Sequence, residues 1–148
     1  MKKRLMLLIA ALLTIGVISG CTYGSGSTRG AVEVNTFSKM SMSYKKFSGY
    51  KTALVKVGKG DAVEVSAAIV TTKGKLDMKI LKKVAPGDGD KAEGKKGQDK
   101  EAIYQGTDLP TSDFKVKLDK PGSYEITVEG EEHEGSYKIT WDKLDLEK

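Results

Sequence analysis

Few side chains in this sequence could do acid–base, nucleophilic or metal chemistry. The 148 residues include a single cysteine, Cys21, and a single histidine, His133. One cysteine excludes an intramolecular disulfide, a multi-cysteine zinc site and an iron–sulfur cluster. One histidine excludes a multi-histidine metal site and argues against a hydrolytic triad. No Gly-x-Ser-x-Gly nucleophile elbow and no phosphate loop of P-loop spacing occur either. We therefore expect a protein that is not an enzyme and needs no cofactor.

Asp88 and Asp90 are the best candidates for metal ligands. They flank a glycine in the segment 85–100, and carboxylate oxygens are ligands that Ca²⁺ prefers. However, Ala92 and Glu93 stand where an EF-hand loop has a ligand and its turn glycine, and nearby lysines repel a cation. We expect no dedicated metal site, while weak calcium binding at Asp88 and Asp90 stays open.

His133 lies within the acidic run Glu131–Glu134, between two stretches with a strand pattern. A histidine in such a turn is usually solvated, and neighbouring carboxylates raise its pKa. We expect this to be a surface effect and do not assign His133 as a metal ligand.

Aromatic side chains are candidates for binding the apolar face of a sugar ring. Tyr124, Tyr137 and Trp141 alternate with polar residues in phase with isoleucines, so we expect them to point into the core. Aromatic residues outside such runs, or out of phase with them, are better candidates for ligand contact. Three residues meet this description: Phe47, Tyr50 and Tyr104.

The elements that must position these side chains are strands, because apolar residues recur with a period of two from Ala31 onward. Turn sequences separate the runs, for example at Gly58–Asp61 and Asp119–Gly122. Short strands at this spacing predict an all-β fold, an antiparallel, jelly-roll-like β-sandwich of about eight strands. The alternating runs are 40–44, 53–57, 63–69, 76–80, 114–118, 124–128 and 137–141.

One sequence pattern occurs twice near the C-terminal end. Residues 122–127 and 135–140 share G-S-Y-x-I-T, and an acidic stretch separates the two copies. We expect the copies to be the two strands of a β-hairpin. The segment 85–100 contains almost no apolar side chain, so we expect a surface loop, and whether it orders on ligand binding stays open.

The first twenty residues have the order of a secretory signal. Basic residues 2–4, an almost continuous apolar run at 5–18 and small residues at 19 and 20 precede Cys21. The apolar run is short for a membrane-spanning helix. The sequence Ile-Ser-Gly-Cys that ends at Cys21 resembles the lipobox of bacterial lipoproteins. This resemblance implies that Cys21 is diacylated and becomes the mature N-terminus.

The lipobox resemblance implies a domain organisation and a location. We expect a lipoprotein signal peptide at 1–20, a flexible tether at 21–30 and a β-sandwich domain at 31–148. The protein would be extracytoplasmic and held to the membrane by its lipid. It would lie on the cell surface of a Gram-positive host. In a Gram-negative host, Thr22 after the cysteine would direct it to the outer membrane.

The charge pattern argues against nucleic acid as a partner. The formal net charge of +5 includes the basic residues 2–4, which leave with the signal peptide. Arg4 and Arg29 are the only arginines, and arginine is the side chain that binds guanine and phosphate in a bidentate way. The predicted export points the same way.

Two motifs, the turn Lys59-Gly60-Asp61 and the strand Pro121–Val128, carry a resemblance that spans most of Phe47–Trp141. With them the chain is similar to small lipoproteins of Gram-positive bacteria with a jelly-roll-like β-sandwich, related in outline to the bacterial pre-peptidase C-terminal domain. It implies a fold and a surface location but no catalytic residue.

Two functions follow from these observations. The first is a non-catalytic binding module at the cell envelope, with a cell-wall glycan, a peptide or a protein as ligand. The second is a structural or accessory subunit of a membrane-associated envelope complex. In both functions we expect the membrane to be a partner, through the lipid on Cys21. The ligand and the oligomeric state do not follow from the sequence.

Overall fold

A computed structural model describes residues 21–84 and 100–144, and within them every regular element is a β-strand. The strands form one antiparallel sheet in the order β1-β3-β7-β4-β5, with β2 also paired to β3 and β6 also paired to β4. No helix in this part of the chain is long and apolar enough to cross a membrane. The strands are β1 (Thr22–Arg29), β2 (Val32–Thr36), β3 (Lys39–Val57), β4 (Ala62–Lys83), β5 (Lys100–Gly106), β6 (Ser112–Leu118) and β7 (Gly122–Leu144).

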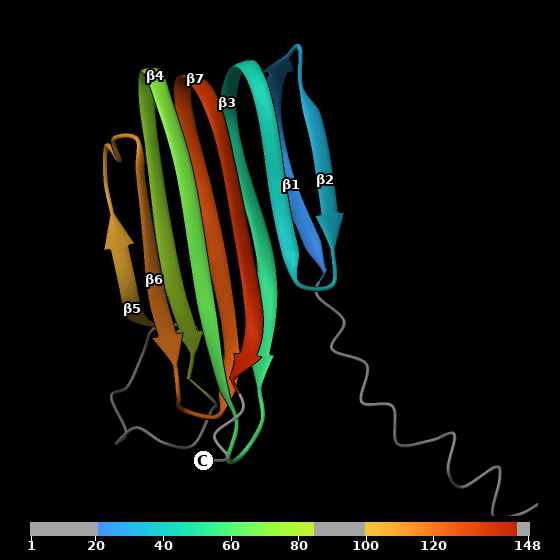
Figure 1. Cartoon of the computed structure of the whole chain (residues 1–148), viewed down its shortest axis with the longest axis vertical. Helices are drawn as coiled ribbons and strands as arrows, with labels where there is room; N and C mark the ends of the chain where they lie inside the picture. Colours follow the sequence, from blue (N-terminus) through green and yellow to red (C-terminus); the bar gives the residue numbers. More distant parts are fainter. Residues whose placement is uncertain (1–20, 85–99, 145–148) are drawn as a thin grey trace, which may run out of the picture.

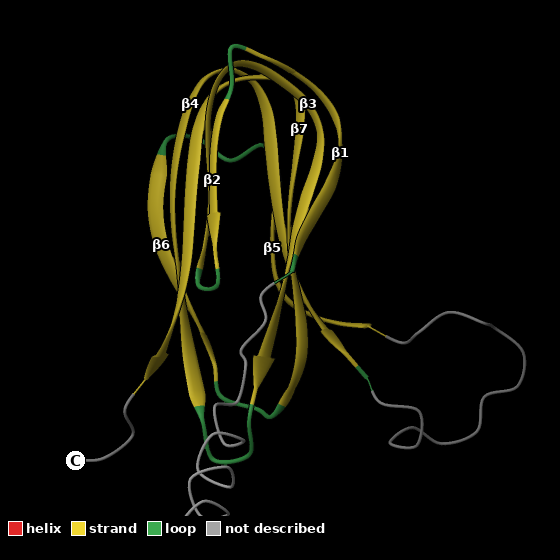
Figure 2. Cartoon of the chain, turned by 90° about the vertical axis from the view of Figure 1, so that its right-hand side faces the viewer, coloured by secondary structure: helices red, strands yellow, loops and turns green. Residues whose placement is uncertain are grey.

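The sheet folds over on itself into two facing layers, because its three central strands are long and sharply bent (Figures 1 and 2). The β2–β6 layer contains β2, β6 and the parts of β3, β7 and β4 that pair between them. The β1–β5 layer contains β1, β5 and the remaining parts of the same three strands. We call the end where the strands bend the closed end. The opposite end, with the turns Gly58–Asp61 and Asp119–Pro121, is the open end.

A one-residue change of phase accompanies each bend. Apart from Glu125, the buried residues of β7 have even numbers up to Gly130 and odd numbers from His133 on. The pairing of β3 and of β4 shifts register at the same height, between Tyr44 and Gly49 and between Thr71 and Lys75. An extra residue in a strand is a β-bulge, which bends the strand. Here it also keeps the apolar side chains on the inner face on both sides of the bend.

The predicted antiparallel β-sandwich is confirmed, with seven described strands where about eight were expected. Each of the long strands β3, β4 and β7 contains two of the predicted short ones, and three described strands, β1, β2 and β5, lie outside the predicted runs. The predicted hairpin of the two G-S-Y-x-I-T copies is wrong for this reason, since both copies lie in β7, one in each layer. The core lies between the layers and is built from the alternating apolar residues of all the long strands, including Tyr124, Tyr137 and Trp141.

The segment expected to be a flexible tether is part of the sheet instead. Thr22–Arg29 form β1, which pairs residue by residue with β3 from Ala53 to Lys46. The small side chains of the segment allow this, because Gly26 and Gly49 pass so close together that a Cβ on either would collide with the opposite backbone. Three other predictions lie outside the described residues: the signal peptide 1–20, nearly all of the loop 85–100, and calcium binding at Asp88 and Asp90.

Candidate functional site

A cleft opens where the two short edge strands stop. β1 begins opposite Ala53, whereas its neighbour β3 continues to Val57. In the other layer the turn between β2 and β3 lies level with Trp141, whereas β7 continues to Leu144. The layers therefore lose their outer strands before they reach the open end, and the space between them becomes accessible from the side.

The cleft has a volume of about 590 Å³ and an apolar floor. Val55, Val63 and Trp141 are buried core residues that form this floor. Phe37 lies at the lip, and this residue is 72% exposed. The complete lining is Phe37, Ser38, Val55, Lys56, Val57, Gly58, Asp61, Val63, Trp141, Asp142 and Lys143.

The lip of the cleft is held in place by Trp141. Its indole Nε1–H donates to the carbonyl oxygen of Phe37 at 2.9 Å, and its backbone N–H donates to the carbonyl oxygen of Ser38 at 2.9 Å. Two hydrogen bonds from one buried residue thus fix the backbone of the turn that presents the Phe37 ring. Because the backbone of this turn is fixed, less conformational freedom is lost when a ligand contacts it.

The rim of the cleft is polar. Lys143 forms an ion pair with Asp61 at 2.9 Å, and Lys56 and Asp142 are exposed beside it. The described lining contains no histidine, cysteine or tyrosine. An apolar floor with a few polar groups at the rim suits reversible binding of a small molecule or of one unit of a polymer.

A second, shallower groove of about 420 Å³ lies on the outer face of the β2–β6 layer. The small residues Ser66 and Ala68 of β4 form its base. They pair with Lys138 and Thr140 on β7 and with Asp113 and Lys115 on β6. Lys115 is bound to Glu64 at 2.6 Å. Phe114, the one aromatic residue in its described lining, is half-buried and stacks on Tyr104, so we regard the cleft at the open end as the stronger site.

The three aromatic residues predicted to contact a ligand do not come together. Phe47 is 1% exposed and packs against Tyr44 near the bend of β3, so the prediction is wrong for this residue. Tyr104 is half-buried and stacks on Phe114 at the inner side of β5, with ring centres 4.8 Å apart. Tyr50 is exposed, and its neighbours in register are Ser25 and Glu129 on the outer face of the β1–β5 layer.

His133 is also in a different place from the one expected. It is fully buried at the closed end, between Tyr44 of β3 and Thr71 of β4. Burial lowers the pKa of its imidazole, whereas neighbouring carboxylates were expected to raise it. The neighbouring glutamates point into solvent: Glu132 and Glu131, for example, pair with Lys46 and Lys75.

The tautomer of His133 follows from its partners. The Thr71 hydroxyl donates its one proton to the carbonyl oxygen of Leu109 at 2.8 Å, so it accepts a hydrogen bond from Nε2–H of His133 at 2.9 Å. Nδ1 of the neutral ring then accepts from the Tyr44 hydroxyl at 2.6 Å. This chain of hydrogen bonds joins β3, β7 and β4 at their bends. Both ring nitrogens of His133 have protein partners within it.

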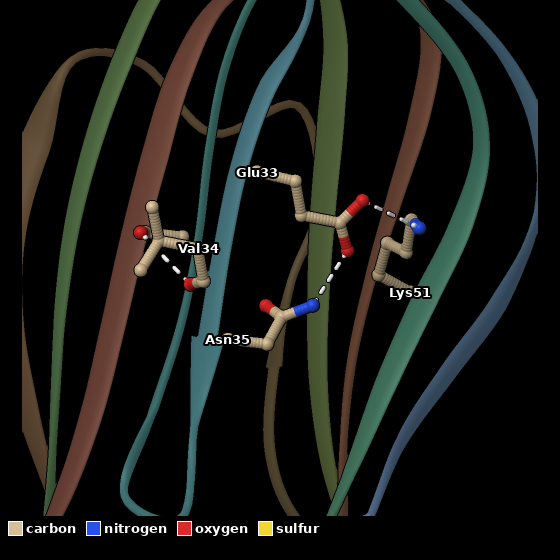
Figure 3. A network of polar contacts seen from close by, with 5 residues as sticks. Glu33, Val34, Asn35 and Lys51 are labelled. Carbon is tan, nitrogen blue, oxygen red and sulfur yellow. Dashed lines mark hydrogen bonds and ion pairs between the residues drawn. The ribbon is translucent and has the colours of Figure 1, made fainter.

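A polar network joins the two layers along the β1–β2 edge (Figure 3). Glu33 of β2 accepts hydrogen bonds from Lys51 of β3 at 3.0 Å and from Asn35 at 2.7 Å. The Ser41 hydroxyl donates to the carbonyl oxygen of Val34. Burial alone would raise the pKa of Glu33, but the bonds from Asn35 and Lys51 and the charge of Lys51 outweigh it and keep the pKa below its usual value. Within the described ranges no three acidic, histidine or cysteine side chains gather as a metal site.

Comparison with known proteins gives no family for this chain. No family model matches it. No curated protein matches its sequence. Among solved structures, it is similar to TmCBM61, determined in complex with β-1,4-galactotriose, with 14% identity, coverage of 83% of this chain and 87% of that one, and a TM-score of 0.44.

Two further solved structures have similar outlines. A family 11 carbohydrate-binding module from Clostridium thermocellum, in complex with a β-1,3-1,4-mixed-linked tetrasaccharide, is 15% identical over 88% of this chain and 91% of that one, with a TM-score of 0.44. A xylan-binding domain of CBM 22 is 12% identical over 88% of each chain, with a TM-score of 0.39. Similarity at these identities and TM-scores concerns the fold alone and assigns no ligand to this chain.

Proposed function

We propose that this chain is a lipid-anchored, non-catalytic binding module of the cell envelope, and that the cleft at the open end is its ligand site. The observation that carries the proposal is the exposed Phe37 ring above an apolar floor. A phenylalanine that is 72% exposed leaves apolar surface in water, and here the backbone that carries it is bonded to Trp141 at the mouth of a cleft.

The chemistry of the cleft favours a ligand with an apolar face and hydroxyl groups along its edge, as a sugar ring has. Phe37 and the floor residues offer the apolar contact. Asp61, Asp142 and the two lysines of the rim offer hydrogen bonds to hydroxyl groups. We therefore propose a glycan of the cell wall as the ligand class, with a peptide as the next candidate.

Titration with muropeptides and cell-wall glycans tests the binding proposal. The amide NMR spectrum of residues 21–148 should shift around the cleft, and Phe37→Ala should weaken the binding at least tenfold because the stacking surface is lost. Val32→Ala is the matched control, since Val32 is 68% exposed on β2 and does not line the cleft. Shifts confined to Tyr50 and its neighbours, or equal affinities of the two variants, would contradict the proposed site.

The lipid anchor is supported by the signal-like leader and by the position of Cys21, which is exposed and directly precedes β1. We expect the wild-type chain to partition with membranes and to incorporate labelled fatty acid. Cys21→Ala should lose both properties while it keeps the fold, because this side chain is not part of the core. Membrane partitioning of Cys21→Ala with undiminished fatty-acid labelling would contradict the anchor.

One observation favours the alternative, an accessory subunit of an envelope complex. Val32, Val34 and Val70 are exposed on the outer face of the β2–β6 layer, where they flank a row of serines. Exposed apolar side chains on a sheet beside an unpaired edge strand suit a protein partner. Cross-linking in intact membranes from a photoreactive residue at position 34, but not at Lys56 near the cleft, would support this second function.

A further inference from the structure

One outer surface of the sandwich is uncharged over most of its length. It belongs to β1 and to the part of β3 that pairs with β1, on the side that faces away from the core. Ala53 and Val55 point into the core, so the residues that alternate with them point outward. We call this surface the tyrosine face. Its residues are Tyr23, Ser25 and Ser27 of β1 and Ser48, Tyr50, Thr52 and Leu54 of β3.

Charged side chains of the described residues begin only at the borders of the tyrosine face. Nearly a third of the chain is charged, so an outer surface of two paired strands without a charge is an exception. Contact with this surface removes water from no ionised group, and the high cost of dehydrating a charge does not arise. The charges at the borders are Arg29, Lys46 and Lys56 at the two ends and Glu125 and Glu129 on β7.

Two exposed tyrosines stand close together on this face. Tyr23 is 48% and Tyr50 is 41% exposed. Tyr23 pairs with Thr52 and Tyr50 pairs with Ser25, so the two tyrosines are diagonal neighbours on adjacent strands, roughly 7–8 Å apart. Tyrosine combines an apolar ring with a polar hydroxyl group, and it is enriched where an apolar phase meets water.

The lipid of the proposed function would leave the protein on this same face. The backbone N–H of Leu54 donates to the carbonyl oxygen of Cys21 at 3.1 Å, which extends the ladder between β1 and β3 by one residue pair. Because side chains alternate along a strand, Cys21 points to the same side as Tyr23. Cys21 is exposed there. An acyl chain on its sulfur would enter a bilayer directly beside the tyrosine face, with no flexible tether between them.

We propose that the tyrosine face lies on the membrane–water interface, so that the sandwich rests on the bilayer with the outer side of β1 and β3. This inference rests on the lipid anchor of the proposed function. The tyrosine rings contact the apolar side of the interface, and the serine and threonine hydroxyl groups hydrogen-bond to the polar groups of the lipids. Because the face carries no charge, the contact needs no anionic lipid.

This orientation turns the β2–β6 layer away from the membrane. Phe37, at the lip of the cleft, lies in the turn between β2 and β3 of that layer. The ring therefore stays accessible to a ligand while the protein rests on the bilayer. Membrane contact and ligand binding use two different surfaces of the sandwich.

The orientation can be measured on the full, lipidated chain. Because an acylated Cys21 has no free thiol, a fluorophore can be attached at one new cysteine, either Ser25→Cys on the tyrosine face or Ser43→Cys on the outer face of the β2–β6 layer. Both serines are exposed. Each protein is reconstituted into phosphatidylcholine vesicles that carry a head-group quencher. The two layers of a sandwich lie about 10 Å apart, so we expect quenching at position 25 to exceed that at position 43 about threefold or more.

Substitution of the tyrosines separates contact by this face from passive tethering. With the label at position 25, Tyr23→Ser and Tyr50→Ser together should bring the quenching down to the level of position 43. The matched control removes two other exposed apolar side chains, with Val32→Ser and Val34→Ser, and should leave the quenching unchanged. High salt should also leave it unchanged, because the contact involves no charge.

A second variant tests the face without removal of a tyrosine. Ser27→Glu places a charge on the tyrosine face, and Ser43→Glu places one on the outer face of the β2–β6 layer. Only Ser27→Glu should reduce the quenching at position 25, since a carboxylate resists transfer out of water. Circular dichroism of each variant shows whether it keeps the fold.

The outcomes distinguish this inference from the function on which it rests. If the chain lacks the fatty acid or does not partition with membranes, the anchor is wrong and the inference fails with it. If the chain is anchored but both labels are quenched equally, or the folded tyrosine variant is quenched like the wild type, the anchor stands and the membrane contact is wrong. A dimer of the unlipidated Cys21→Ala chain that Tyr50→Ser abolishes would show that a second copy covers this face instead.

Discussion

His133 shows how strongly one side chain depends on its surroundings. Its sequence neighbours are glutamates, which would raise its pKa in a solvated turn. The bend of β7 turns the ring inward instead, where burial lowers the pKa and both nitrogens are already bonded. Protonation would put a second N–H against the Tyr44 hydroxyl, which would then have to find a new acceptor for its own proton. The fold therefore holds the ring in its neutral form.

This leads to a pH prediction. The unfolded chain binds a proton on His133 near pH 6.5, whereas the folded chain binds it only at lower pH, so stability should fall as the pH drops below about 6.5. We expect the Tm to decrease between pH 7.5 and pH 5. In His133→Gln the Tm should be lower at pH 7.5 but nearly constant across this range.

Thermal unfolding followed by circular dichroism measures both proteins. Glu33 and Glu125 have lowered pKa values, so they stabilise the fold at neutral pH and lose this contribution only as the pH falls below the ordinary carboxylate pKa. They therefore do not account for a slope between pH 7.5 and pH 5. A slope between pH 7.5 and pH 5 that is the same in wild type and His133→Gln would show that another group is responsible.

The bends of the long strands depend on residues that tolerate a left-handed backbone. Gly74 in β4 has φ of 72° and lies against Glu132 in β7, which itself has φ of 52°. A Cβ on Gly74 would collide with the carbonyl group of Glu132. The contact between these two residues brings β4 and β7 together at the point where both strands cross from one layer to the other.

Gly74→Ala should therefore be more damaging than an ordinary substitution in a turn. Gly60 is the matched control, since its φ of 82° is similar but a Cβ there would meet nothing within 4 Å. We expect Gly60→Ala to cost about 1–2 kcal/mol from the left-handed backbone alone, and Gly74→Ala to cost clearly more. Urea denaturation gives both values, and equal costs would mean that the contact at the bend is unimportant.

The strands show what the sequence could and could not predict at this scale. Every alternating run from 40–44 to 137–141 lies in a strand with its apolar side chains buried or half-buried, because the period of two depends only on local geometry. The sequence did not reveal that pairs of runs are continuous, because the residues between them, such as 131–134, read as turns. The odd offset of thirteen between Tyr124 and Tyr137 was the available signal, since both face inward only if one extra residue intervenes.

The candidate site could be predicted less well than the fold. The cleft forms where the edge strands β1 and β2 stop. Their ends are set by pairing with β3, which the composition of the sequence does not show. Trp141 was correctly expected in the core, but its hydrogen bond to the backbone of Phe37 joins residues far apart in the sequence. Phe37 lies outside the alternating runs, as the predicted contacts Phe47 and Tyr50 do, and this property alone did not distinguish among them.

At the scale of the whole molecule, β1 is an integral part of the folded sheet. A chain that starts at residue 31 lacks β1, so that β3 becomes an edge strand from Lys46 to Ala53 and stays paired there only with β7. We expect it to be less stable than a chain that starts at residue 21 by at least about 2 kcal/mol, because several backbone hydrogen bonds of about 1 kcal/mol each are lost. Urea midpoints of the two chains measure the difference, and equal midpoints would show that β1 is dispensable.

The place of Cys21 at the start of an edge strand has a mechanical consequence. A protein held by its lipid and dragged away by flow or by a bound polymer would be pulled along the axis of β1, away from the closed end. The force would then act on the ladder between β1 and β3 in shear, so that many hydrogen bonds bear it together instead of opening one by one. Detachment under load would be governed by a rate of rupture, and the anchor strand itself would be the clamp that sets it.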